Sequence, residues 1–192
     1  TTPDHAMMAD YVASTRNDRV TAYDLASGEE LWRFYTGGPV RVAPAAFDDK
    51  LYVASDDGHL YCLNAADGRL RWRFRGGPSD RRLVGNERLI ATWPCRGGPV
   101  VDRGKVYFAA GLWPFMGTFI YALDAESGRV VWFCDETSFT FRRMPHIGSV
   151  AFSGLSPQGH LAVADGKLIV PGGHSNPAVI DAWTGEFLFY AH

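Results

Sequence analysis

The sequence predicts an all-β protein, a β-propeller segment of about four four-stranded antiparallel blades. Three observations predict this fold: one turn signature occurs four times, short alternating strands precede each turn, and an aromatic residue follows it at a constant distance. The hydrophobic fraction of 46% and the 21 glycines suit many short strands around a core. We expect residues 1–192 to form one propeller segment.

The turn signature consists of Asp or Asn, a glycine four residues later, and an aromatic residue four residues after the glycine. Asp or Asn can hydrogen-bond to its own backbone as a turn begins, and glycine adopts a positive φ angle at the end of the turn. Each signature therefore predicts the hairpin turn between the third and fourth strands of a blade. The four signatures are Asp24, Gly28 and Trp32; Asn64, Gly68 and Trp72; Asp124, Gly128 and Trp132; and Asp181, Gly185 and Phe189.

The repeats cover approximately residues 10–36, 37–76, 97–134 and 159–191. In the second repeat an extended stretch at 40–47 and strands at 51–55 and 60–63 lead through short turns to the signature. The first repeat lacks a clear first strand, because the segment 1–9 is short and polar. Four strands in a period of about 40 residues match a propeller blade, whereas an immunoglobulin-like sandwich gives no reason for one turn to recur.

Composition argues against several kinds of partner and site. The net charge of -2 gives no clustered basic excess for a nucleic-acid partner. Apolar runs such as 106–113 are far shorter than the roughly 20 residues that span a bilayer, so no membrane span is expected. Cys62, Cys95 and Cys134 are odd in number and scattered, which argues against a disulfide framework and a zinc site. We expect them to be small buried apolar residues, and we predict no metal ligands.

The pattern Ala-x-Asp-x-x-Ser/Thr-Gly-x-x-x-Trp resembles the pyrroloquinoline-quinone (PQQ) type repeat. Quinoprotein dehydrogenases contain this repeat, and so do noncatalytic relatives such as the propeller lipoprotein of the outer-membrane assembly machinery. The resemblance runs from about Tyr11 to Tyr190 and implies seven or eight blades, with the remaining blades in a longer chain. It implies a periplasmic or otherwise extracytoplasmic location. It also implies that Trp32, Trp72 and Trp132 dock between adjacent blades, with Phe189 as a departure.

Long loops interrupt the repeat, because the four turn glycines are 40, 60 and 57 residues apart. The extra length falls at 75–96, 111–118 and 134–158, and blade topology places all three segments on one face. These loops and one further turn contain six candidate ligand-binding residues: Arg96, Trp113, Arg142, Arg143, His146 and His174. Arg, Trp and His can recognise a carboxylate or a planar ring. Alternatively, the aromatic residues cap the propeller, and the arginines are solvated or paired with Asp80 and Asp135.

No catalytic motif or phosphate-binding loop is present, so we assign no catalytic residue. We favour a noncatalytic binding or scaffold module that requires no cofactor, with a protein or a small molecule on the long-loop face. The alternative is part of a PQQ- and calcium-dependent oxidoreductase of the alcohol or sugar dehydrogenase type. Such enzymes use vicinal cysteines, a calcium ligand set and a catalytic aspartate, none of which we can locate in this chain.

Overall fold

A computed structural model describes residues 18–85, 87–139, 141–143, 150–152, 154–172 and 177–190. Of residues 138, 139, 141–143, 150–152, 189 and 190 it describes only the backbone. Nineteen strands and two short 3-10 helices make up the regular structure of these parts. The predicted all-β propeller fold is confirmed by several antiparallel sheets and by the propeller relatives reported below.

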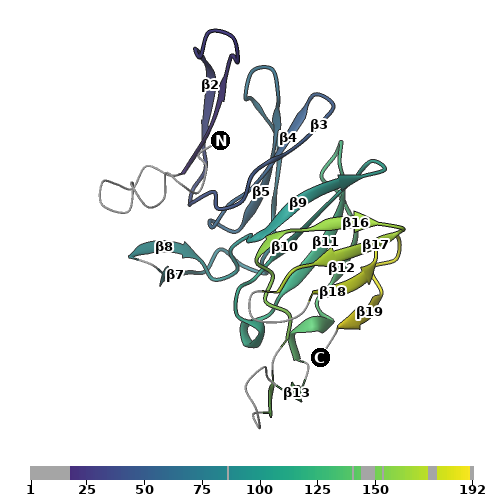
Figure 1. Ribbon diagram of the computed structural model, residues 1–192. Coiled ribbons are helices and arrows are strands. Elements are labelled where there is room, and N and C mark those ends of the chain that lie inside the picture. The colour runs from purple at the N-terminus through teal and green to yellow at the C-terminus, as the bar shows by residue number, and fades with distance from the viewer. Residues whose placement is uncertain are drawn as a thin grey trace.

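The strands form successive sheets, which we call blades 1 to 4. Blade 1 contains β1 (Arg19–Tyr23) and β2 (Glu30–Tyr35); blade 2 contains β3 (Ala45–Phe47), β4 (Lys50–Ala54), β5 (His59–Asn64) and β6 (Leu70–Arg75). Blade 3 contains β9 (Gly97–Asp102), β10 (Lys105–Ala110), β11 (Phe119–Asp124) and β12 (Val130–Cys134). Blade 4 contains β16 (Ala162–Ala164), β17 (Lys167–Val170), β18 (Ala178–Asp181) and β19 (Phe187–Tyr190). The blades follow one another in an open arc (Figure 1).

The remaining elements belong to the links between blades. Hairpin β7 (Arg82–Gly85) and β8 (Arg88–Ala91) lies between blades 2 and 3, and hairpin β13 (Phe141–Arg143) and β14 (Val150–Phe152) lies between blades 3 and 4. The 3-10 helices are η1 (Pro114–Met116) and η2 (Glu136–Phe139). Strand β15 (Gly159–His160) pairs in parallel with β9 and so joins the start of the fourth repeat to blade 3.

The repeated turns have the geometry that their residues favour. The φ angles of Gly28, Gly68, Gly128 and Gly185 lie between 69° and 78°. In the third turn, Oδ1 of Asp124 accepts hydrogen bonds from the backbone N–H of Ser127 at 2.8 Å and from its hydroxyl at 2.6 Å. These hydrogen bonds lower the pKa of Asp124, the hydroxyl bond contributing most. Each such turn is therefore stabilised by its own side chains.

The hydrophobic core lies between the blades. One cluster joins Val20 of blade 1 to Val53 and Leu63 of blade 2, and two more join blade 2 to blade 3 and blade 3 to blade 4. Cys62, Cys95 and Cys134 are free and buried, as expected from the sequence. Burial raises the pKa of the Cys95 thiol well above its usual value, so this thiol is not activated.

Each tryptophan of the signature reaches into the next blade. The indole Nε1 of Trp132 donates a hydrogen bond to the carbonyl oxygen of Ala182 at 3.1 Å, and a Cβ placed on Gly185 would lie 2.7 Å from its ring. Trp32 and Trp72 make the same contacts with Ala65 and Gly68 and with Ala125 and Gly128 (Nε1 to oxygen 3.0 and 3.3 Å). At these positions glycine is needed for space as well as for its φ angle.

A tyrosine on the second strand adds another donor at two of these joints. The hydroxyl of Tyr52 donates to the Ala125 carbonyl, and that of Tyr107 donates to the Ala182 carbonyl, both at 3.0 Å. Each alanine carbonyl thus accepts one indole N–H and one phenol O–H from the preceding blade. Because both tyrosines are buried, these bonds satisfy phenol hydroxyls that water cannot reach.

The four turn glycines lie in the hairpin turns that the repeat predicts. The residues at which each repeat was predicted to begin and end stay predictions. No helix in the described part of the chain is long and apolar enough to cross a membrane.

Candidate functional site

The long loops predicted to share one face contact one another. The backbone N–H of Cys95 bonds to the carbonyl of Ser55 at 3.1 Å, and that of Gly111 bonds to the carbonyl of Pro94 at 3.0 Å. The indole of Trp93 donates to the Met116 carbonyl at 2.7 Å. The link between blades 2 and 3 is therefore packed against the second-to-third-strand turns of both blades.

The six predicted site residues do not come together as one group. Arg96 lies at the start of blade 3, and Trp113 precedes η1, where it is half-buried. Arg142 and Arg143 lie on β13, where only their backbone is described. His146 and His174 lie outside the described residues. Arg96 is therefore the predicted residue around which a site can be built.

Asp56 holds Arg96 and a second arginine, Arg41, in place. Both side-chain oxygens of Asp56 accept from Arg96, whose Nε and Nη2 lie 3.0 Å away, and Nε of Arg41 lies 2.5 Å from Oδ2. The Asp56 side chain is fully buried, and the two arginines expose 19% or less of theirs. Neither Asp80 nor Asp135 pairs with Arg96 in these contacts; Asp80 pairs with Arg75 at 3.2 Å. The two guanidinium groups are thus oriented by one buried carboxylate.

The turn that carries Asp56 is itself held by its neighbour Asp57. The Asp57 side chain accepts hydrogen bonds from the N–H of Gly37 at 2.8 Å, the N–H of His59 at 3.0 Å and the hydroxyl of Tyr61. Burial raises the pKa of Asp57, but the hydrogen bonds from His59 and Tyr61 outweigh it, and the net pKa is lowered. The Asp57 carboxylate is therefore charged, and its hydrogen bonds hold the turn and with it the carboxylate of Asp56 in place.

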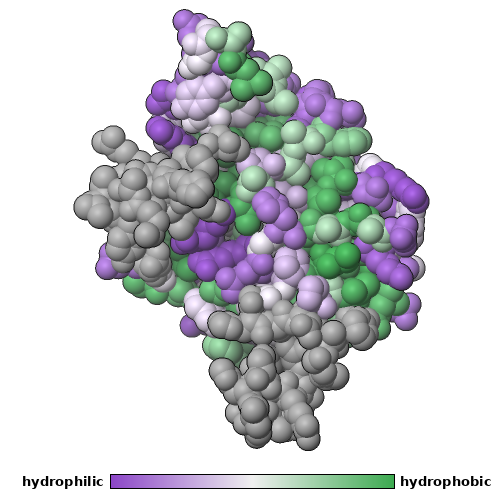
Figure 2. Space-filling model, in the orientation of Figure 1, coloured by the Kyte–Doolittle hydropathy of each residue, from purple (hydrophilic) through white to green (hydrophobic). Residues whose placement is uncertain are grey.

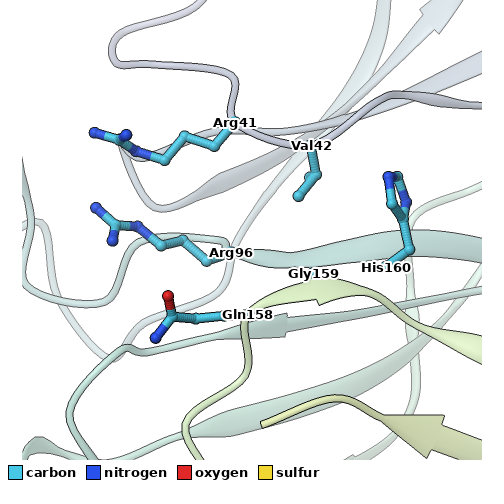
Figure 3. Close-up of a pocket in the computed structure, with 6 residues that line it drawn as sticks. All are labelled: Arg41, Val42, Arg96, Gln158, Gly159 and His160. Carbon is cyan, nitrogen blue, oxygen red and sulfur yellow. The ribbon is translucent and has the colours of Figure 1, made fainter. Parts of the chain in front are cut away.

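A pocket of about 350 Å³ lies beside the two arginines, lined by Arg41, Val42, Arg96, Gln158, Gly159 and His160. The side chains of Arg41, Arg96 and Gln158 extend in the same direction, and His160 lies at the other end (Figure 3). These residues precede or begin the first strands of blades 2, 3 and 4. First strands line the axis of a propeller, so this is an axial pocket.

Five residues of this pocket were missed by the sequence prediction: Arg41, Val42, Gln158, Gly159 and His160. Arg41 and Val42 lie in a short link that looks like ordinary blade connection, and Gln158 to His160 lie at the end of the long segment 134–158 or directly after it. Asp56 lies in a turn, where acidic residues are common. The available signal was positional, because Arg41, Arg96 and Gln158 all occur just before a first strand in successive repeats. Blade topology brings such positions to the axis.

The described residues provide no cluster of metal ligands. No group of three or more His, Cys, Asp or Glu side chains that could hold a metal ion occurs among them. The carboxylate of Asp56 is already used by two arginines. The axial pocket is thus suited to an anion rather than to a cation.

Residues 16–189 match the model of a family named PQQ_2, described as outer membrane protein assembly factor BamB. The chain belongs to this family. The resemblance to the PQQ-type repeat that the sequence suggested is therefore confirmed.

Among curated proteins, the dehydrogenase subunit of alcohol dehydrogenase (quinone) from Gluconobacter oxydans is 30% identical over 132 residues. The match covers 62% of this chain and 17% of that subunit, so the chain spans a small part of the length of this relative. Among solved structures, quinohemoprotein alcohol dehydrogenase ADHIIG from Pseudomonas putida HK5 matches with a TM-score of 0.67 and 19% identity. The match covers 91% of this chain and 31% of that one.

BamB from Moraxella catarrhalis matches with a TM-score of 0.52 and 18% identity, covering 92% of this chain and 59% of that one. Both solved structures are less than 25% identical to this PQQ_2 chain. They therefore support its fold and leave its ligand and activity to be argued from the site.

Proposed function

We propose that this PQQ_2 chain is part of a noncatalytic binding propeller, and that its axial pocket binds a small molecule through a carboxylate. One observation carries this proposal: Asp56 fixes Arg41 and Arg96 side by side at the pocket. An oriented pair of guanidinium groups recognises a carboxylate through charge-assisted hydrogen bonds. Gln158 lies on the same side and supplies an amide for a neutral polar group of the ligand.

Burial makes such recognition effective. Side chains of arginines that expose 19% or less are partly shielded from water, so their attraction to an anion is screened less than at an open surface. The aliphatic side chain of Val42 gives the pocket an apolar wall for the body of the ligand. The ligand class favoured by this arrangement is a compact carboxylic acid with an apolar or planar skeleton.

Calorimetric titration of the protein with PQQ and with benzene-1,3,5-tricarboxylate tests the proposal. We expect binding of at least one probe, and we expect Arg96→Gln to weaken it about tenfold or more, as loss of a charge-assisted hydrogen bond does. Arg81→Gln is the matched control, because Arg81 is an exposed arginine of the same link between blades 2 and 3. Binding that falls equally in both variants, or no binding of either probe, contradicts the proposal.

A second candidate function is part of a quinoprotein oxidoreductase, favoured by the quinone-dependent alcohol dehydrogenase relative. The two arginines fit the carboxylates of PQQ. Bound PQQ would be the oxidant for an alcohol. The described residues offer no matching set of calcium ligands, and we assign no base. Dye-linked oxidation of alcohols by the protein loaded with PQQ and calcium tests this candidate: turnover lost in Arg96→Gln supports it, and binding without turnover supports the noncatalytic proposal.

The family resemblance bears on the location of the protein, and its exposed apolar side chains bear on its partners. We propose that the protein works outside the cytoplasm, as the resemblance to PQQ-type proteins implies. The β7–β8 hairpin and the loop that contains η1 expose large apolar side chains, Val84 at 75%, Leu89 at 61% and Phe115 at 72%, and these suit contact with a partner protein. Fractionation of the native host cells tests the location.

A further inference from the structure

The axial pocket has a second end, which is formed by His160. Figure 3 shows His160 at the end opposite to the guanidinium groups of Arg41 and Arg96. His160 is exposed, and in the part of the chain that the structure describes its side chain makes no hydrogen bond or ion pair. An imidazole donates a hydrogen bond from whichever of its nitrogens carries the proton. The pocket therefore has oriented guanidinium groups at one end and an available donor at the other.

Strand pairing sets the separation of the two ends. In the parallel pair of β15 and β9, His160 is aligned with Gly98. The backbone N–H of Gly159 donates to the carbonyl of Arg96 at 3.0 Å, and that of Leu161 donates to the carbonyl of Gly98 at 3.2 Å. The backbone of His160 thus lies two residues beyond the level of Arg96, which is roughly 7 Å along a strand. A ligand that reaches both ends must be elongated.

Gly98 allows the imidazole to lie against the strand. A Cβ placed on Gly98 would lie 3.0 Å from Nδ1 of His160 and 3.2 Å from Cγ2 of Val42, so both side chains pack over the bare backbone there. The next residue, Leu161, is buried in the core cluster between blades 3 and 4. Because side chains alternate along an extended chain, His160 faces away from that core. The imidazole is thus positioned by packing, and its polar edge remains available to a ligand.

We propose that the axial pocket selects an extended dicarboxylic acid, with one carboxylate on Arg41 and Arg96 and the second accepting a hydrogen bond from His160. This inference rests on the proposed carboxylate binding, and it names the ligand class and the residue that selects it. Val42 lies between the two ends and offers an apolar wall to the chain that joins the carboxylates. A monocarboxylic acid of the same length places an apolar tail against the imidazole.

The chemistry of the His160 end favours a second acidic group over an apolar one. An apolar tail would exclude water from the imidazole without replacing its hydrogen bonds, which is unfavourable. A carboxylate accepts a hydrogen bond from an imidazole in either of its protonation states, and the bond is charge-assisted. Hydrophilic residues also occupy the middle of the view in Figure 2, beside the apolar residues over the sheet formed by β16 to β19. A ligand with two charged ends therefore meets a polar surface on this side of the arc.

Calorimetric titration of the full natural polypeptide with adipate and hexanoate tests the selection, because the two acids have chains of equal length and differ in one carboxylate. We expect adipate to bind at least about tenfold more tightly, as one hydrogen bond to a charged group provides. His160→Phe keeps a planar ring and removes the donor, so it should reduce this preference to about threefold or less. His160→Gln keeps an N–H donor and should retain more of the preference. Equal affinities of the wild type for the two acids, or a preference that survives His160→Phe, overturns the proposal.

Two further variants separate this proposal from the proposed function. Gly98→Ala places a methyl group against the imidazole and should also lower the preference for adipate. Arg96→Gln should instead weaken both acids by a similar factor and leave their ratio within about threefold. Thermal unfolding of each variant checks that it is folded. Binding of both acids without a preference overturns the role of His160 alone, whereas no binding of either acid contradicts the carboxylate site as well.

Discussion

Acidic side chains serve different purposes on the two faces of the blades. On the short-turn face, Asp124 is half-buried and makes solvent-exposed hydrogen bonds with a residue of its own turn, Ser127. On the long-loop face, Asp56 is buried and bonds to Arg41 and Arg96, which lie 15 and 40 residues away. The first arrangement is specified by a few neighbouring residues. The second exists only after blades 2 and 3 have assembled side by side.

The difference teaches where each face obtains its stability. The short-turn face relies on main-chain carbonyls offered to the indoles and phenols of the preceding blade, so the Asp-based turn contributes mainly geometry. The long-loop face relies on a charge that water cannot reach. Four substitutions rank these contributions, from the largest expected effect to the smallest.

Trp132→Ala should have the largest effect, because it removes a buried indole and its hydrogen bond to Ala182. We expect a loss of about 3–5 kcal/mol of unfolding free energy, measured by urea denaturation. Trp183→Ala is the matched control: Trp183 is 48% exposed and contacts Lys105 through a cation–π interaction, so about 1 kcal/mol or less is expected. Equal losses would show that the signature tryptophan is not the main element of the joint.

Asp56→Asn should cost slightly less, about 2–3 kcal/mol, because it leaves two half-buried guanidinium groups without their carboxylate. The measurement is again urea denaturation. Asp67→Asn, at an exposed turn on the opposite face, should cost under about 0.5 kcal/mol. If Asp56→Asn left the unfolding free energy unchanged, the buried carboxylate of the long-loop face would contribute no more to stability than the carboxylates of the short turns.

Tyr107→Phe removes one hydroxyl and leaves the apolar packing in place. The carbonyl oxygen of Ala182 then keeps the Trp132 indole as its donor, so we expect a loss of about 1 kcal/mol of unfolding free energy. A double-mutant cycle with Trp132→Phe measures how the two donors share the carbonyl. Strict additivity would indicate that they act independently.

The smallest effect belongs to Asp124→Ala, for which we expect at most about 0.5 kcal/mol because the bonds are exposed. The effect of this substitution should depend on pH. The folded-state pKa of Asp124 is lowered below 3.8, as are those of Asp24 and Asp181, so their contributions are complete above that range and are lost as the pH falls through it. Thermal unfolding at acidic pH should converge for wild type and Asp124→Ala, and a constant difference would contradict this.

The fold could be predicted from the sequence because the turn signature acts locally. Asp124, Ser127 and Gly128 contain within five residues the hydrogen bonds and the φ angle of a hairpin turn. The tyrosine donors were also readable in principle, since Tyr52 and Tyr107 occur at the same place in successive second strands. They were overlooked because tyrosine in a strand is common.

The candidate site could be predicted only in part. Arg96 was singled out, but its partner Asp56 lies in a different blade and nothing in its local sequence indicates burial. Arg41 and Gln158 reach the same pocket only through the curvature of the arc. Sequence patterns report which strands form, whereas a pocket on an axis depends on how several blades are arranged around it.

The shared alanine carbonyl bears on how such a protein can grow. Because Trp72 and Tyr52 recognise a main-chain atom, the fit does not require a particular side chain on the receiving turn beyond one small enough to be approached. A duplicated blade would dock on its own copy without compensating changes. Chimeras that exchange or repeat blades 2 and 3 should therefore assemble readily.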